Sequence, residues 1–145
     1  MYKALDIAKY IVQKCIDEKD PISNLQLQKI LYFIQVYYLR NKNTPLFNDD
    51  FEAWQFGPVI PKVYTQYSMY GAGKIGHLYG QEILKGEEIA IEDQRNIDLI
   101  TEEKRTLSPW DLVEDTHDKT KAWYYVYSRL GKRAPITKSL MRERG

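Results

Sequence analysis

The chain has 145 residues, one cysteine, and 21 Lys and Arg against 20 Asp and Glu. This length suits one compact domain that buries roughly two-thirds of its unfolded surface, so we expect residues 1–145 to form a single domain without disulfides. No run approaches the ~18 apolar residues that a membrane span needs, and no secretory signal is visible. We therefore expect a soluble, cytoplasmic protein, and the single Cys15 fits a reducing compartment.

The charge is unevenly distributed along the chain. Residues 81–120 carry 5 basic and 12 acidic residues, whereas residues 121–145 carry 7 basic and 1 acidic residue. Either these segments neutralise each other in the fold, or they form a charged surface that steers a partner. At a net charge of +1, nucleic-acid binding through bulk charge is disfavoured, because backbone binders are strongly basic.

The first part of the sequence predicts two amphipathic helices. Apolar residues recur at three- and four-residue spacing over residues 5–16, and Pro21 ends this helix. Ser23 and Gln26 form a capping box at the start of the second helix, whose apolar stripe spans residues 27–38.

The next elements are a short strand and a third helix. The aromatic-rich run at residues 51–56 predicts the strand, and Gly57-Pro58 breaks it. Pro61 suits the first turn of the helix, and Gly71 suits its left-handed cap.

The second half of the sequence predicts a small hairpin and four helices. The hairpin would pair residues 83–84 with residues 89–91. The helices are expected over residues 93–105, after the cap Ser108 with Pro109 at the first position, over residues 120–130, and after Pro135. The predicted fold class is mainly α with minor β: a compact bundle of about six helices with a short two- or three-stranded β element.

The sequence contains only weak signals for a nucleotide or a metal. Residues 71–76 (GAGKIG) match the letters of the dinucleotide fingerprint, but a helix rather than a strand precedes the glycines. His77, His117 and Cys15 lack the spacing of a zinc site. We therefore predict no cofactor and no metal.

A hydrolase is the enzymatic alternative. His117 could act as a base held by a neighbouring carboxylate. Its nucleophile is the weak point, because Ser108 and Thr116 are near only in sequence and triads assemble from distant segments. Packing at a helix end explains His117 more simply, so we predict no catalytic residue and no enzyme.

Tyrosine is abundant, with 12 copies, mostly grouped at residues 32–38, 64–70 and 124–127. Tyrosine provides a large contact area at little rotamer cost, so exposed copies suit recognition of a protein, although they also fill cores and their rims. Stacking on single-stranded nucleic acid would need interleaved Lys or Arg, and only Lys62 lies close to the second group.

Three segments together resemble the Panacea domain, the SocA-like, phage-associated antitoxin family. They are residues 23–33 (SNLQLQKILYF), residues 52–64 (EAWQFGPVIPKVY) and residues 112–123 (LVEDTHDKTKAW). They occur in the family's order, and the resemblance spans residues 4–140. The middle segment is the most specific of the three.

This resemblance implies an antitoxin that binds and neutralises a cognate toxin protein, usually encoded beside it. It also implies, for at least one family type, an adaptor that hands the toxin to an ATP-dependent protease. The motif residues that it marks as fold-defining are Trp54, Gly57, Pro58, Tyr64, Thr116, His117 and Trp123.

We expect the toxin to contact exposed tyrosines of the second and third helices and the basic C-terminal segment. The candidate partner-binding residues are Tyr37, Tyr67, Tyr70, Arg129 and Arg133. The alternative function is a nucleic-acid-binding phage or prophage regulator, but no helix-turn-helix with a basic recognition helix is identified. Self-association into a homo-oligomer is left open, and no membrane partner is expected.

Overall fold

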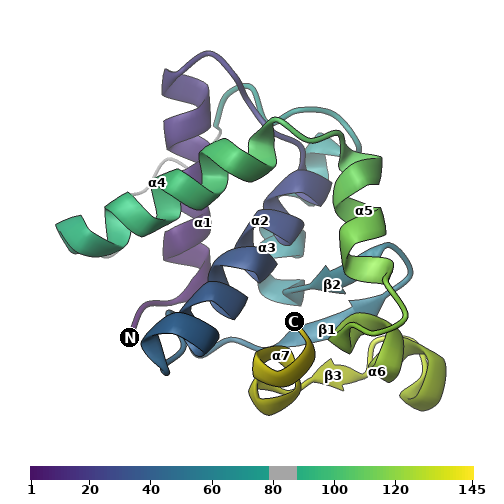
Figure 1. Cartoon of the computed structure of the whole chain (residues 1–145). Helices are drawn as coiled ribbons and strands as arrows, with labels where there is room; N and C mark the ends of the chain where they lie inside the picture. The colour runs from purple at the N-terminus through teal and green to yellow at the C-terminus, as the bar shows by residue number, and fades with distance from the viewer. Residues whose placement is uncertain (79–87) are drawn as a thin grey trace.

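The computed structural model describes residues 1–78 and 88–145 of the chain. These residues form seven α-helices and a three-stranded antiparallel sheet (Figure 1). The elements are α1 (Ala4–Asp17), α2 (Asn24–Tyr37), β1 (Phe51–Trp54), β2 (Gly57–Val59), α3 (Pro61–Gln66), α4 (Ile91–Arg105), α5 (Pro109–His117), α6 (Ala122–Leu130), β3 (Pro135–Ile136) and α7 (Lys138–Arg144). The predicted class, mainly α with minor β, is confirmed. Within the described ranges, no helix has the length and hydropathy to cross a membrane.

Helix α2 forms the centre of the fold and runs through the middle of Figure 1, between α1 and α5. Leu27, Ile30 and Ile34 of its apolar stripe are fully buried, and α1, α3, α4, α5 and β2 pack against the helix. The predicted capping box is present. The backbone N–H of Gln26 donates to Ser23 Oγ at 3.2 Å, and the backbone N–H of Ser23 donates to Gln26 Oε1 at 3.0 Å.

The sheet joins the middle of the chain to its C-terminal part, in the strand order β2-β1-β3. Gly57-Pro58 does not end the strand region, as the sequence predicted, but begins β2, with Gly57 opposite Trp54. Gly57 has a φ of +116°, which allows the tight reversal after β1. Pro58 is tolerated because β2 is an edge strand.

The predicted hairpin is wrong in its second strand. Residues 83–84 lie outside the described residues, residues 89–90 form no strand, and Ile91 begins α4. The glycine-rich residues 71–76 form a loop that pairs with the segment before α2. In this loop the backbone N–H of Ile75 donates to the Ile22 carbonyl at 2.8 Å, so the loop is part of the core packing.

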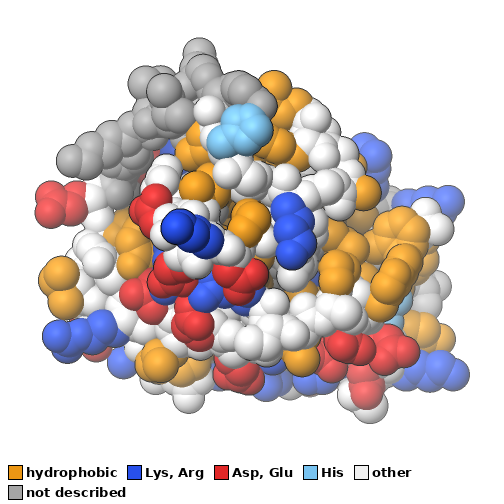
Figure 2. Space-filling view, turned by 90° about the horizontal axis from the view of Figure 1, so that it is seen from above, with side chains coloured by type: hydrophobic (Ala, Val, Ile, Leu, Met, Phe, Trp, Pro, Cys, Tyr) orange, Lys and Arg blue, Asp and Glu red, His pale blue; other side chains and the backbone are white. Residues whose placement is uncertain are grey.

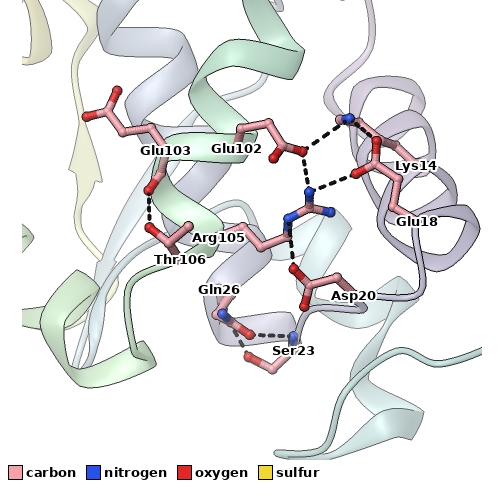
Figure 3. Close-up of polar contacts among 9 residues, drawn as sticks. All are labelled: Lys14, Glu18, Asp20, Ser23, Gln26, Glu102, Glu103, Arg105 and Thr106. Atoms are coloured by element: carbon pink, nitrogen blue, oxygen red, sulfur yellow. Dashed lines mark hydrogen bonds and ion pairs between the residues drawn. The ribbon is translucent and has the colours of Figure 1, made fainter.

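The face over the upper ends of α1, α4 and α5 carries intermingled acidic and basic side chains near its middle (Figure 2). The close-up in Figure 3 shows the network that ties the end of α4 to the end of α1. Arg105 Nη2 pairs with Glu18 at 2.7 Å, and its Nε pairs with Asp20 at 3.2 Å. Lys14 pairs with Glu102 at 3.4 Å and also with Glu18. Hydrogen bonds from Lys14 and then Arg105 lower the pKa of Glu18 to about 2.

No ion pair of the described residues joins the acidic segment to the basic segment, so the interpretation in which the two segments neutralise each other finds no support in direct pairing. Among the described residues, carboxylates of residues 81–120 pair with Lys14, Lys104 and Arg105, and with Lys42 at 3.5 Å, but with no cation of residues 121–145. The basic C-terminal segment therefore keeps most of its charge at the surface.

Candidate functional site

A buried lysine on α2 joins segments that are distant in the sequence. Lys29 is fully buried, and its Nζ donates a hydrogen bond to the Pro58 carbonyl at 3.1 Å. A Cβ atom on Gly57 would lie 2.7 Å from Lys29 Cε and 2.9 Å from Thr116 Oγ1, so these groups are in tight contact. Burial lowers the pKa of Lys29 to about 7, because desolvation disfavours the charged amine.

Trp123 extends this buried contact to α6. Its indole is 5% exposed, and its Nε1 donates to the Trp54 carbonyl at 2.7 Å. The ring of His117 stacks on the indole at a centroid distance of 3.6 Å, and Tyr127 stacks at 4.7 Å. We call the set Lys29, Gly57, Pro58, Thr116, His117 and Trp123 the Lys29 cluster.

The hydroxyls considered as nucleophiles for His117 are engaged elsewhere. Thr116 Oγ1 donates to a carbonyl of its own helix at 2.9 Å, and Ser108 Oγ accepts a backbone N–H at 3.1 Å as the cap of α5. Burial, and then the charge of Lys29, lower the pKa of His117, while a hydrogen bond with the Phe56 backbone acts in the opposite direction. Over residues 1–78 and 88–145, no group of three His, Cys, Asp or Glu side chains could hold a metal ion.

A groove of about 810 Å³ lies next to the Lys29 cluster. Its walls come from the start of α2, the β1–β2 turn, α3, the loop after Tyr70, the start of α5, and the segment between α6 and β3. Several polar groups in the α2 wall are already used, since Asn24 Nδ2 donates to the Tyr64 carbonyl at 3.1 Å and Gln28 Oε1 accepts the Ile60 N–H at 3.0 Å. The volume lies within the range of about 300–1,000 Å³ that is typical of ligand sites.

Exposed aromatic rings line the groove. Phe56, Tyr64 and Trp110 are 47%, 40% and 64% exposed. Phe56 and Trp110 meet edge to face at 5.8 Å, and Trp54 meets Tyr64 at 5.0 Å. Figure 2 shows hydrophobic side chains gathered over the α5 side of the molecule. We call this concavity the aromatic groove.

The segment between α6 and β3 adds two cations to the rim. Lys132 and Arg133 line the groove, and the guanidinium of Arg133 lies 4.3 Å from the centroid of the Trp54 ring. In the part of the chain that the structure describes, neither cation pairs with a carboxylate. The groove is therefore mostly apolar in its walls and positive at one edge.

The structure separates the five residues expected to bind a partner. Tyr67 is fully buried, so the expectation that it is exposed is wrong: the short α3 turns this ring into the core. Tyr37 is half-buried near the C-terminal end of α2, about 14 Å along the helix from Gln28, the nearest groove residue of α2. Tyr70 is half-buried and donates to the His77 carbonyl at 2.7 Å, and Arg129 lies over the Tyr125 ring.

Of those five, only Arg133 lines the aromatic groove. Sequence reasoning missed Phe56, Trp110 and Lys132 as surface residues. Helical periodicity gives no clear signal for Trp110: it precedes Leu112 by about 200° around α5 but lies only about 60° from Val113, and both of those residues face the core.

The chain belongs to the family described as "Antitoxin SocA-like, Panacea domain", whose model matches residues 27–124. This range contains the whole Lys29 cluster and the aromatic lining of the groove, and it ends before Lys132 and Arg133. The resemblance seen in the three sequence segments is thereby confirmed.

A particular relative is "Antitoxin SocA" of Caulobacter vibrioides (strain NA1000 / CB15N), which is 39% identical over 124 residues. The alignment covers 81% of this chain and 66% of that protein, so the chain spans just under two-thirds of the relative's length. No solved structure matches the chain.

Proposed function

We propose that this protein is an antitoxin that binds a cognate toxin protein and neutralises it by covering its active surface. In this proposal residues 1–145 act as one domain, and neutralisation needs no catalysis by the chain. The observation that carries the proposal is that a member of an antitoxin family exposes three aromatic side chains around one groove.

The aromatic groove is suited to anchor a protein interface. A standard interface buries about 800 Å² on each partner, and a few aromatic or Arg side chains contribute most of its energy. Phe56, Trp110 and Arg133 are of these types and surround one concavity. Because the groove is smaller than such an interface, neighbouring surface must contribute as well, and Tyr70 lies just before the groove residue Gly71.

Co-expression with the product of the neighbouring gene tests the proposal. We expect the wild-type chain to restore growth and to co-purify with that toxin. The double variant Phe56→Ala with Trp110→Ala should weaken binding by about a hundredfold and abolish rescue, because interface anchors typically cost 2 kcal/mol or more. Leu99→Ala on α4 is the matched control, since it removes a side chain that is 70% exposed outside the groove.

The same experiment separates masking from delivery to an ATP-dependent protease. Masking leaves the amount of toxin unchanged while growth is restored, whereas delivery shortens the half-life of the toxin. A toxin that remains lethal and unbound beside the folded wild-type chain would contradict the proposed function.

A further inference from the structure

The charge of the aromatic groove has one sign. Among the described residues that line it, Lys132 and Arg133 are the only ones with charged side chains, and both are basic. Five other described cations are paired with carboxylates: Lys14, Lys42, Lys104, Arg105 and Lys138. The two groove cations have no such partner in the described part of the chain, so their charge remains available to an incoming group.

Arg133 is held in place before any partner arrives. Its backbone has a φ of +64°, a left-handed conformation that is uncommon for a residue with a side chain. Its N–H donates to the Ala53 carbonyl at 2.7 Å, and the guanidinium lies over the Trp54 ring. Preorganisation of this kind lowers the entropy that binding must overcome.

Two helices also begin at the groove. Asn24 and Leu25, in the first turn of α2, and Pro109 and Trp110, in the first turn of α5, belong to its lining. Helix N-termini carry partial positive charge, and the first turn of α2 contains no acidic residue. Asp111 offsets this effect at α5. Lys132, Arg133 and the start of α2 therefore favour an anion at the basic edge. The Glu52 carboxylate, which accepts the Trp54 Nε1–H at 2.9 Å, acts in the opposite direction.

We infer that the aromatic groove binds a segment of the toxin in which a carboxylate side chain stands beside an aromatic or aliphatic side chain. The carboxylate lies against Arg133 and Lys132, and the apolar side chain packs against Phe56 and Trp110. This inference rests on the proposed function and names the part of the toxin that the antitoxin recognises.

A protein segment fits these observations better than a nucleic acid does. Phe56 and Trp110 meet at an interplanar angle of 81°, so their rings do not form the parallel platform on which successive bases stack. The two cations are adjacent at one edge, whereas a nucleic-acid site needs positive charge along the path of the backbone.

Short overlapping peptides that cover the toxin sequence provide the first test. We expect the wild-type chain to bind peptides that contain Asp or Glu next to an aromatic or aliphatic residue, and binding is followed by tryptophan fluorescence, because Trp54 and Trp110 both line the groove. Replacing that Asp or Glu with its amide should weaken binding about tenfold. Equal binding of the acid and the amide would overturn the inference.

A charge exchange provides the second test, in the full chain with the full toxin. Lys132→Glu with Arg133→Glu should abolish binding, and replacing the toxin's acidic residue with Lys should restore it to the doubly changed antitoxin. Arg95→Glu with Lys119→Glu makes the same change in net charge at exposed positions outside the groove lining and should leave binding unchanged. Circular dichroism and a thermal melt show whether each variant is folded.

The outcomes separate this inference from the proposed function. If the wild-type chain binds and rescues but the charge exchange has no effect, the proposed function stands and the inference fails. If the wild-type chain neither binds nor rescues, the proposed function fails first. Tighter binding of oligo(dT) than of any toxin peptide, lost in the Lys132→Glu and Arg133→Glu variant, would overturn the inference in favour of a nucleic acid.

Discussion

The Lys29 cluster and the aromatic groove are neighbours, but they use the same kinds of side chain in opposite ways. Trp123 is 5% exposed and makes a hydrogen bond and two ring contacts, whereas Trp110 is 64% exposed and touches one ring. Lys29 is fully buried with one carbonyl partner, whereas Arg133 lies at the surface over a tryptophan ring.

Consecutive residues divide between the two regions. Phe56 lines the groove and is 47% exposed, whereas the next residue, Gly57, is buried and packs on Lys29. The difference teaches that one short motif can supply both the packing that stabilises the fold and the surface that a partner can reach. Substitutions in the Lys29 cluster should therefore change mainly the free energy of unfolding, whereas substitutions in the groove should change mainly the affinity for a partner.

Trp123 and Trp110 should differ most in their contribution to the free energy of unfolding. We expect Trp123→Ala to lower the free energy of unfolding by about 3–5 kcal/mol, because it removes a buried ring and leaves a cavity. Trp110→Ala should change it by no more than about 0.5 kcal/mol, since little of that ring is covered. Denaturant titration measures both values, and a comparable loss for Trp110→Ala would show that the groove is part of the core.

Gly57 in the Lys29 cluster and Gly71 in the groove allow the stability of the two regions to be compared by backbone substitutions. Gly57→Ala should cost about 2–4 kcal/mol, because the new Cβ would overlap Lys29 and Thr116 at a φ of +116°. Gly71, which lines the groove, is the matched control: its φ is +58° and no atom lies within 4 Å of a Cβ built there.

Gly71→Ala should therefore cost about 1–3 kcal/mol, the backbone strain alone, because residues with a side chain rarely adopt a φ of +58° with a ψ of −135°. Equal losses at both glycines in the same denaturant titration would contradict the tight contact of Gly57 with Lys29.

Lys29 makes the stability of the cluster depend on pH. Its pKa in the folded chain is about 7, below the ordinary value of 10.5, so the unfolded chain binds more protons between these values and stability rises with pH. Relative to Lys29→Met, the wild-type free energy of unfolding should increase by about 1 kcal/mol per pH unit from pH 7 to 9. A pH-independent difference between the two proteins would mean that Lys29 is not desolvated.

The smallest expected effect lies outside both regions, in the ionic network of Figure 3. The pKa of Glu18 is lowered to about 2, so its contribution to stability is present above the ordinary value of 4.5 and is lost as the pH falls through about 2. The side chain is 40% exposed, and solvent screening limits the effect of Glu18→Gln at pH 7 to about 0.5–1 kcal/mol. Thermal melts of the two proteins should converge near pH 2, and a difference that persists there would exclude the ion pairs as its cause.

Much of the fold could be predicted from local patterns. The capping box at Ser23, the cap at Ser108 and the helix start at Pro61 all occur where the sequence indicated, and the strand predicted over residues 51–56 covers residues 51–54. The absence of the second hairpin strand could not be predicted from the sequence. Ile89, Ala90 and Ile91 suit a strand locally, but in the fold Ile91 is the first residue of α4. The groove was missed because its walls come from segments that the sequence places tens of residues apart.

By itself the sequence determined the helices, their caps and the family, since these depend on residues within a few positions of one another or on motifs in a given order. Only the tertiary structure decided that Tyr67 is enclosed, that Trp110 is exposed, and that Arg133 lies beside both Trp54 and the start of α2. The physical reason is that periodicity identifies the face of a helix that is buried, whereas exposure at its edges depends on which distant segments cover it.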